Sequence, residues 1–356
     1  MSIKKALTIL ALTMAAALCG GCSSLPAEER SFAVALGVSA SGAHWAVCAR
    51  IPSYQTDGGY LTLSAEGSSF REAMAVLDAS APMRMHYAQL RLIIAARDLA
   101  ESETFPTLVR ELTSRHDVRQ QATLCVTEDD PAAVMDALDP ATGSRLSKSL
   151  DALLDARAAQ GVISRASLAD IALMGERQSP VLPAVALKGG DSLRPGMDAP
   201  AASQAIGGDA GELRIGGGYM VGQGGRVRGA LTPLEQQLLA LLTGQLTKGP
   251  LTLREGTLTL LDASSRVTLS GGAAHCRLLV RCENTPLTEE GAQRALTDAL
   301  TALTGKLSAA GCDALGLARQ LIAHSSTLAD WHRRDWPARY PAIPWEIAVE
   351  VRQEAG

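Results

Sequence analysis

The sequence predicts a multi-domain protein of the α+β class, in which mixed sheets are flanked by helices. Apolar runs of strand length alternate with segments of helical periodicity through the first half, and this order is typical of mixed α/β domains. The second half places further strand patterns around one long amphipathic helix. A chain of 356 residues is also long enough for about two or three domains.

A stretch rich in proline and glycine marks the predicted boundary between domains. Residues 180–212 hold four prolines and two pairs of adjacent glycines, a composition typical of a linker or a long surface loop. The predicted division is residues 1–21 as a signal peptide, 22–179 as an N-terminal α/β domain, 180–212 as the linker or loop, and 213–356 as a C-terminal α+β domain. The last domain can subdivide, which would give three domains in all.

The first residues have the pattern of an export signal. Lys4 and Lys5 precede an apolar run over residues 6–18, too short to span a bilayer, which takes ~20 residues. Small residues then end on Cys22, and this pattern suggests a bacterial lipoprotein signal cleaved in front of that cysteine. The Cys22 thiolate would carry a diacylglycerol, whose buried CH₂ groups each contribute ~0.8 kcal/mol to membrane binding. The alternative is an ordinary cleaved signal peptide.

Strand and helix signals follow each other closely in the first half. Ser68 or Ser69 precedes apolar residues at helical spacing, and Asp130 followed by Pro131 is a typical helix start. The predicted strands are residues 32–38, 46–51, 89–95 and 122–126. The predicted helices are one through residue 77, one from 99 or 105 to 114, one from 131, 146–159 and 167–175.

The second half has equally clear helix caps. Thr232 before Pro233 starts one predicted helix, and Thr288 starts a longer one that ends at the small residues 309–311. The predicted strands are 213–221, 251–261, 267–270, 275–282 and 345–352. In the last strand large apolar residues alternate with charged ones, so we expect it to be half-buried.

Charge and cysteine usage narrow the possible partners and ligands. A net charge of −4 argues against nucleic acid and against a basic patch that grips anionic lipid. Beyond residue 22 the cysteines are not at metal-ligand spacings, and two of them lie six apart on one predicted strand, about 20 Å from each other. We therefore expect five buried, small apolar side chains: Cys48, Cys125, Cys276, Cys282 and Cys312.

Familiar catalytic motifs are missing from the sequence. It has no Gly-x-Ser-x-Gly elbow, no His-Glu-x-x-His and no phosphate-binding loop with Gly-Lys-Ser/Thr. Residues 128–130 are acidic and could bind a cation, although a solvated cap on a helix N-terminus explains them better. We predict that the protein is not an enzyme and has no catalytic residue, metal site or cofactor.

Tryptophan and arginine gather near the C-terminus. Residues 331–345 hold three of the four tryptophans, and Arg333 and Arg334 lie between Trp331 and Trp336. One interpretation is that this segment connects the long helix to the closing strand and is held in place by its tryptophans. At least two of Trp331, Trp336 and Trp345 would then be largely buried. The other is an exposed patch of Trp331, Arg333, Arg334 and Trp336 that docks a partner.

Four stretches in a characteristic order resemble the Ger(x)C family, the C subunits of nutrient germinant receptors in bacterial spores. Each motif is weak alone, and the order and spacing of the four make the resemblance specific. They are residues 69–73 leading to 90–94 and 98–100; 115–119 leading into the strand 122–126; 217–221 leading through 228–232 to Glu235; and 312–316 with Trp331, Trp336 and residues 345–352.

The resemblance implies a place and partners for the protein. It implies a lipid-anchored body at the membrane, on the outer face of the spore inner membrane, beside a membrane-embedded A subunit and a transporter-like B subunit. It implies no catalytic residues. Two other functions stay open: a lipoprotein substrate-binding module of a transporter, which needs a cleft between two lobes, and an exported hydrolase, which needs a nucleophile and a base within hydrogen-bond reach.

Overall fold

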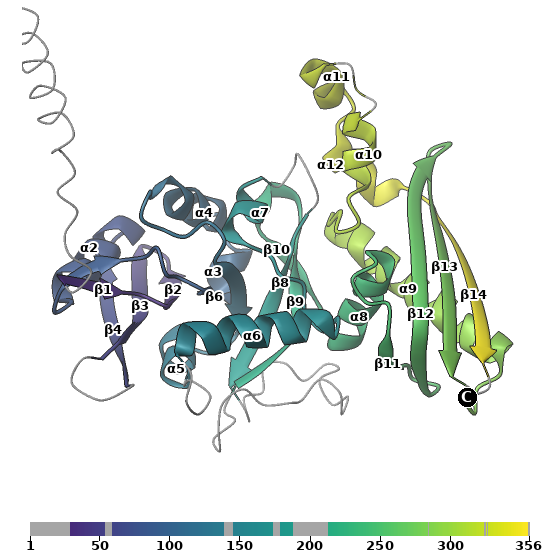
Figure 1. The fold of residues 1–356 in the computed structure, drawn as a ribbon. Coiled ribbons are helices and arrows are strands. Elements are labelled where there is room, and N and C mark those ends of the chain that lie inside the picture. Colours follow the sequence, from purple (N-terminus) through teal and green to yellow (C-terminus); the bar gives the residue numbers. More distant parts are fainter. Residues whose placement is uncertain are drawn as a thin grey trace, which may run out of the picture.

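A computed structural model of the chain describes residues 29–53, 59–138, 145–173, 179–187, 213–283, 285–323, 325 and 327–354. Figure 1 shows a larger body built on one sheet, a smaller body built on a second sheet, and a group of short helices that projects away from both. The predicted signal peptide, residues 1–21, and the predicted lipidation site Cys22 lie outside the described residues.

The helices and strands have the following bounds. The strands are β1 Arg30–Phe32, β2 Ala35–Ser41, β3 His44–Pro52, β4 Tyr60–Gly67, β5 Arg84–His86, β6 Leu92–Ala96, β7 Thr123–Thr127, β8 Val181–Leu187, β9 Leu213–Val221, β10 Val227–Leu231, β11 Gly249–Thr252, β12 Thr257–Ser270, β13 Ala273–Glu283 and β14 Trp345–Glu354. The helices are α2 Phe70–Ser80, α3 Arg97–Glu101, α4 Phe105–Ser114, α5 Pro131–Asp136, α6 Leu146–Ala159, α7 Leu168–Ala172, α8 Pro233–Leu242, α9 Glu289–Ala310, α10 Leu317–Ala323, α11 Leu328–Arg333 and α12 Trp336–Arg339, with short 3₁₀ turns η3 Gln223–Gly225 and η4 Tyr340–Ala342.

The larger body is organised by an eight-stranded sheet with the order β10-β9-β8-β7-β6-β2-β3-β4. Its centre, from β2 through β6 and β7 to β8, is parallel, and the strands on either side of this centre pair antiparallel. Parallel neighbours need long crossovers, and the helices between the strands supply them. The α+β class with mixed sheets is therefore confirmed.

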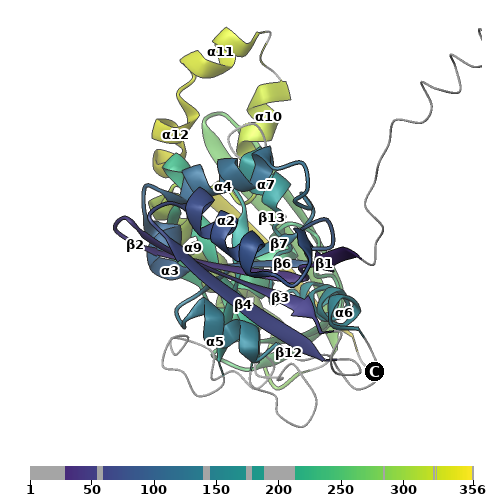
Figure 2. The same cartoon turned by 90° about the vertical axis from the view of Figure 1, so that its left-hand side faces the viewer.

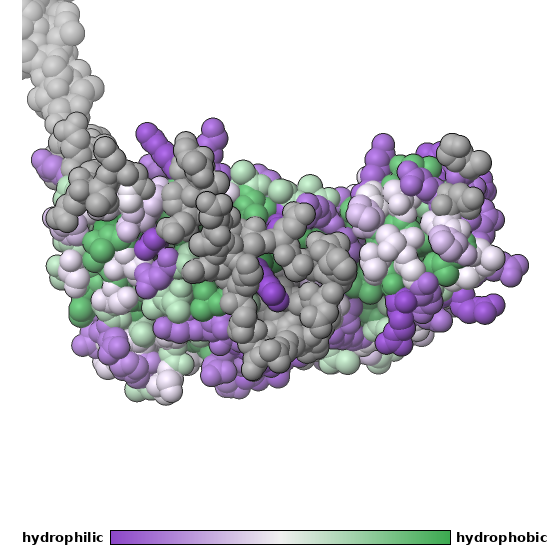
Figure 3. All heavy atoms as spheres, turned by 90° about the horizontal axis from the view of Figure 1, so that it is seen from below, coloured by the Kyte–Doolittle hydropathy of each residue, from purple (hydrophilic) through white to green (hydrophobic). Residues whose placement is uncertain are grey.

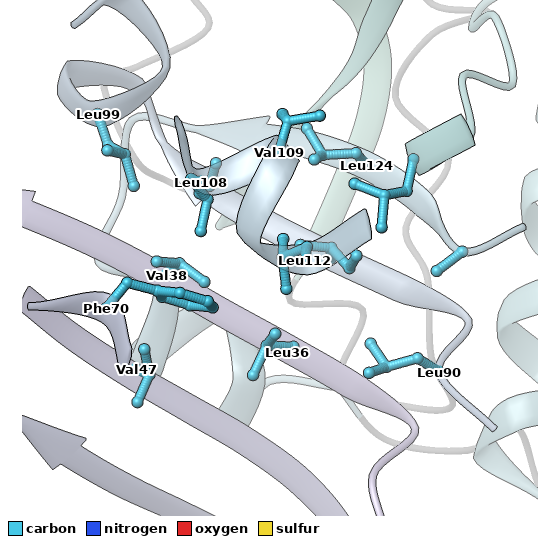
Figure 4. Close-up of a cluster of buried hydrophobic side chains, with 14 of the residues drawn as sticks. Leu36, Val38, Val47, Phe70, Leu90, Leu99, Leu108, Val109, Leu112 and Leu124 are labelled. Carbon is cyan, nitrogen blue, oxygen red and sulfur yellow. The ribbon is translucent and has the colours of Figure 1, made fainter. Parts of the chain in front are cut away.

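Helices cover both faces of this sheet. On one face α2, α3, α4 and α7 pack against apolar side chains, and Figure 4 shows Phe70, Leu108 and Leu112 directed at Leu36 and Val38 of β2. On the other face α5 and α6 complete the second layer of the core (Figure 2). A strand buried on both faces reads as a continuous apolar run, which is what the sequence of β6 shows.

Local hydrogen bonds explain where most helices begin. The Ser69 side chain accepts from the Glu72 N–H, and Asp130 does the same for Ala132. Thr232 and Glu235 form a reciprocal capping box at the start of α8, and Thr288 caps α9. These contacts join residues two or three positions apart, so the predicted helix starts agree closely with the observed ones.

The predicted linker is wrong at its N-terminal end. Residues 181–187 form β8, which lies beside β7 inside the larger sheet, and β9 and β10 also belong to that sheet although we assigned them to the C-terminal domain. We did not predict a strand here because proline is rare inside sheets and Pro183 lies in the middle of β8. The pairing of β8 with β9 shifts register between Pro183 and Val185, and this irregularity accommodates the ring. Residues 188–212 lie outside the described part of the chain.

The smaller body has a four-stranded sheet with the order β11-β12-β13-β14. β12 is one strand over the region where we predicted two, with a register shift between Leu260 and Asp262. The closing strand β14 pairs in parallel with β13, and α8 and α9 pack on one face only. The five cysteines of the described chain are free and buried, as predicted. Within these residues no helix combines the length and apolar character that crossing a membrane requires.

Candidate partner-docking site

The predicted docking residues lie on a projection that we call the arm, the described residues of 317–342. It comprises α10, α11, α12 and η4, and it extends beyond the edge of both bodies in two perpendicular views (Figures 1 and 2). Its helices are short, so the arm depends on contacts at its base for a defined position.

Asp313 organises the base of the arm. One carboxylate oxygen accepts from the backbone N–H of Leu317 at 2.9 Å, and the other accepts from Ala318 at 2.6 Å and from the indole Nε1–H of Trp336 at 3.2 Å. The residue is only 4% exposed. Burial raises the pKa of the Asp313 carboxyl, and the N–H donors oppose that rise because they favour the charged form. Asp313 therefore ties α10 to α12.

An aromatic cluster fills the space around this carboxylate. The rings of Trp336 and Tyr340 lie 5.7 Å apart between centroids, and the Tyr340 hydroxyl donates to the carbonyl of Cys312 at 2.9 Å. Trp345 donates its indole N–H to the Ser308 hydroxyl at 3.1 Å, which joins the closing strand to α9. Each buried aromatic polar atom therefore has a partner, as burial requires.

The structure separates the predicted docking residues into two groups. Trp336 is 7% exposed and belongs to the cluster at the base, so its place in an exposed patch was predicted wrongly. Asp335 adopts a left-handed φ of 43°, and this reversal turns α12 back toward Asp313. Trp331 and Trp345 are half-buried at the same cluster, so only one of the three tryptophans is largely buried, and we expected at least two.

The outer surface of the arm is basic. Arg333 is exposed and pairs with Asp330, whereas the half-buried Arg334 has no side-chain partner among the described residues. Residues 317–342 contain four arginines and two aspartates, in a chain whose net charge is −4. The arm therefore has a local charge opposite to that of the whole protein, and an acidic partner surface would be complementary to it.

Gln320 fixes the arm to the smaller sheet. Its side-chain amide donates to the carbonyl of Val267 at 3.0 Å, and its carbonyl oxygen accepts from the Leu269 N–H at 3.0 Å. Here β12 extends past its neighbour β11, which pairs only with residues 257–260. The Gln320 amide thus satisfies backbone hydrogen-bonding groups at the edge of β12, as a neighbouring strand would.

The base of the arm also contacts the larger body. The Ser179 N–H donates to the backbone carbonyl of Asp313 at 3.0 Å. Gly222, directly after β9, lies so close to α9 that an added Cβ would be 2.2 Å from the carbonyl oxygen of Ala310. The arm therefore starts where the two bodies meet.

Asp313 and Gln320 are site residues that we did not predict. The usual cap signal does not find Asp313, because an N-cap stands immediately before its helix and Asp313 lies four residues before Leu317, the first residue of α10. The contact of Asp313 with Trp336 spans 23 positions and has no local signal. Gln320 bonds to a strand 51 and 53 positions away, which sequence periodicity does not encode.

The acidic residues 128–130 have structural roles. Glu128 accepts from the Tyr219 hydroxyl and from Arg97, both at 2.9 Å, and Asp130 caps α5. Asp129 accepts from the Leu187 N–H at 2.7 Å, which holds the end of β8. In the described part of the chain no group of three or more His, Cys, Asp and Glu side chains is placed to hold a metal ion.

Comparison with known proteins identifies a family domain in the N-terminal part of the chain. Residues 23–187 match the family described as Spore germination protein N-terminal domain, and the match ends at the last residue of β8. The crystal structure of the GerBC protein has the same fold, with a TM-score of 0.50 and 11% identity over 90% of this chain and 98% of that chain. No curated protein matches the sequence. Residues 23–187 therefore belong to the family of spore germination protein N-terminal domains, and the chain has the fold of the GerBC protein.

Proposed function

We propose that the protein is the lipid-anchored, non-enzymatic C subunit of a nutrient germinant receptor, which supports receptor assembly or signalling in spore germination. The observation that carries this proposal is the family match over residues 23–187. Its partners are the membrane-embedded A and B subunits, and its place is the outer face of the spore inner membrane. The protein then acts by binding, and its arm is the surface that meets the other subunits.

The anchor at Cys22 belongs to the same proposal. A lipid that confines the protein to the membrane of its partners raises their effective concentration, with an avidity gain of order 10²–10⁴. In the variant Cys22→Ala the fold stays intact, because residue 22 precedes β1, the first strand of the described residues. Lipid labelling disappears, the protein moves toward the soluble fraction, and germination in response to nutrients weakens. Full germination with the variant retained at the membrane would contradict the role of the lipid.

The arm supplies a direct test of docking. The double variant Arg333→Glu, Arg334→Glu reverses two charges on the arm without touching Asp313 or Trp336. We expect it to fold normally and to recover less of the A and B subunits in co-purification from spore membranes. Arg294→Glu on the exposed side of α9 is the matched control and should recover them fully. Equal recovery with both variants would remove the arm from the interface.

The same co-purification separates the receptor from the transporter alternative. A substrate-binding module would bring down an ABC permease in place of the receptor subunits. Such a module also needs convergent polar groups in a cleft between two lobes. A hollow lined by Arg266 and Arg277 lies instead on an open face of the four-stranded sheet. Recovery of a permease alone would overturn the proposed function.

A further inference from the structure

One face of the four-stranded sheet has no helix packed on it in the described chain. In Figure 1 this face is turned toward the viewer, and α9 crosses behind the strands. Side chains of β13 alternate accordingly: Leu278 and Val280 are buried against α9, whereas Arg277 and Arg281 are exposed on the other side. We call this second side the outer face. Seen from below, apolar areas of the molecule are small and separated by hydrophilic ones (Figure 3).

Most charged side chains on the outer face are paired. Arg281 binds Asp262 at 3.3 Å and Glu354 at 3.0 Å. His275 Nδ1 lies 2.9 Å from a carboxylate oxygen of Glu346. A guanidinium nitrogen of Arg352 lies 2.6 Å from a carboxylate oxygen of Glu350. The acidic side chains of these pairs, those of Asp262, Glu346, Glu350 and Glu354, thus already have a partner.

Two arginines at the centre of the face are exceptions. Arg266 on β12 and Arg277 on β13 have no ion pair or hydrogen bond through their side chains among the described residues, and the strand register places them directly opposite each other. Side chains in such a pair have Cβ atoms roughly 4.5–5.5 Å apart, and like charges there are destabilising. The native fold therefore places two like charges at opposing strand positions, and neither has an acidic partner among the described residues.

The same two arginines line a hollow of about 610 Å³. Arg277 has Ala348 as its neighbour on β14, and this small side chain leaves room between the longer ones. Thr268 and Ser270 bring hydroxyl groups to the hollow, and His275, directly opposite Thr268, and its partner Glu346 also line it. The hollow thus combines two unpaired cations with neutral hydrogen-bond donors.

We propose that this hollow binds a phosphate-class oxyanion through Arg266 and Arg277. A phosphate or phosphomonoester group carries about −1.5 to −2 charges near neutral pH, which balances two guanidinium groups, whereas one carboxylate balances only one of them. Guanidinium groups bind such oxygens in bidentate fashion, and the Thr268 hydroxyl donates a further hydrogen bond. The bound anion removes the repulsion between the two arginines, so binding also stabilises the smaller body.

Thermal unfolding with inorganic phosphate tests the proposal on the full chain. At constant ionic strength, held with sodium chloride, phosphate should raise the Tm of the protein. Arg266→Gln and Arg277→Gln should each abolish this rise and weaken phosphate binding in calorimetry at least about tenfold. In phosphate-free buffer each variant should unfold at the wild-type temperature or above it, because one of the two like charges is gone.

A matched control and a second probe complete the experiment. Arg281→Gln lies on the same face but removes an arginine that is already paired, and it should keep the full phosphate response. Vesicles of phosphatidylcholine with and without phosphatidic acid distinguish the source of the anion. Binding to phosphatidic acid that Arg277→Gln abolishes assigns the hollow to a lipid headgroup, and a phosphate response without vesicle binding assigns it to a soluble phosphate. A wild-type protein without either response, or a Gln variant that keeps it, overturns the proposal.

Discussion

The eight-stranded sheet and the four-stranded sheet of this protein differ in what covers them. The eight-stranded sheet has helices on both faces, whereas the four-stranded sheet has helices on one face and charged side chains on the other. The first sheet therefore serves mainly as a folded core. Features that can meet a partner or ligand, the arm and the arginine hollow, belong to the second body, where surface is left uncovered. The proposed arginine hollow thus lies on a sheet face that no described helix covers.

The largest expected effect comes from testing that comparison on adjacent residues. Ile93 and Ile94 of β6 face opposite helical layers, and each is 0% exposed. Replacing either with Ala should cost about 2–5 kcal/mol in the free energy of unfolding. The adjacent residues Leu278 and Leu279 of β13 should differ. Leu278→Ala should cost as much as the isoleucine variants, whereas Leu279 is 38% exposed and its replacement by Ala should change the free energy of unfolding by less than about 0.5 kcal/mol. Urea unfolding measures the free energy of unfolding of all four variants. A small loss of stability in Ile94→Ala would contradict the burial of β6 on both faces.

A somewhat smaller effect is expected at the base of the arm. Asp313→Ala leaves the N–H groups of Leu317, Ala318 and Trp336 without an acceptor in a buried position. Loss of a buried partner costs about 1–3 kcal/mol, and the arm should open locally before the sheets unfold. Hydrogen exchange should therefore accelerate in α10 and α12 and stay unchanged in β6. Asp298→Ala on the exposed side of α9 is the control. Protection of α10 retained in Asp313→Ala would show that Asp313 does not hold the arm.

The junction between the two bodies should respond to a single methyl group. A Cβ at Gly222 would lie 2.2 Å from the Ala310 carbonyl oxygen, so Gly222→Ala should cost about 1–3 kcal/mol through overpacking. Gly305→Ala within α9 is the matched control, because no atom outside the neighbouring backbone of α9 lies within 4 Å of the added group. It should stabilise the protein by about 0.4–1 kcal/mol. If both variants behave alike, close packing at residue 222 does not join the bodies.

The smallest effect concerns an ion pair inside the second body. Lys306 Nζ contacts the two carboxylate oxygens of Glu235 at 2.9 and 2.8 Å and so links α9 to α8. Both side chains are partly exposed, and solvent screens such pairs. Lys306→Met should therefore cost less than about 1 kcal/mol, because apolar burial of Leu300 and Leu303 holds the helix. A cost above that of Leu278→Ala would show that charge, not burial, fastens α9 to the second body.

Sequence reasoning succeeded where the controlling contacts are local. The caps at Ser69, Asp130 and Thr232 join residues two or three positions apart, and the burial of Cys276 and Cys282 follows from alternation along one strand. The α+β class follows from the order of such elements. Residues whose partners are neighbours in the chain could be placed from the printed letters alone.

Only the tertiary structure decided which distant residues meet. It placed β8 inside the larger sheet in spite of Pro183, and it turned Trp336 toward Asp313 and away from solvent. It also set the register that puts Arg266 opposite Arg277. The physical reason is that strand pairing and core packing depend on side chains far apart in sequence, whose free energies enter only when the whole fold closes, whereas a cap or an alternating strand depends on a few consecutive residues.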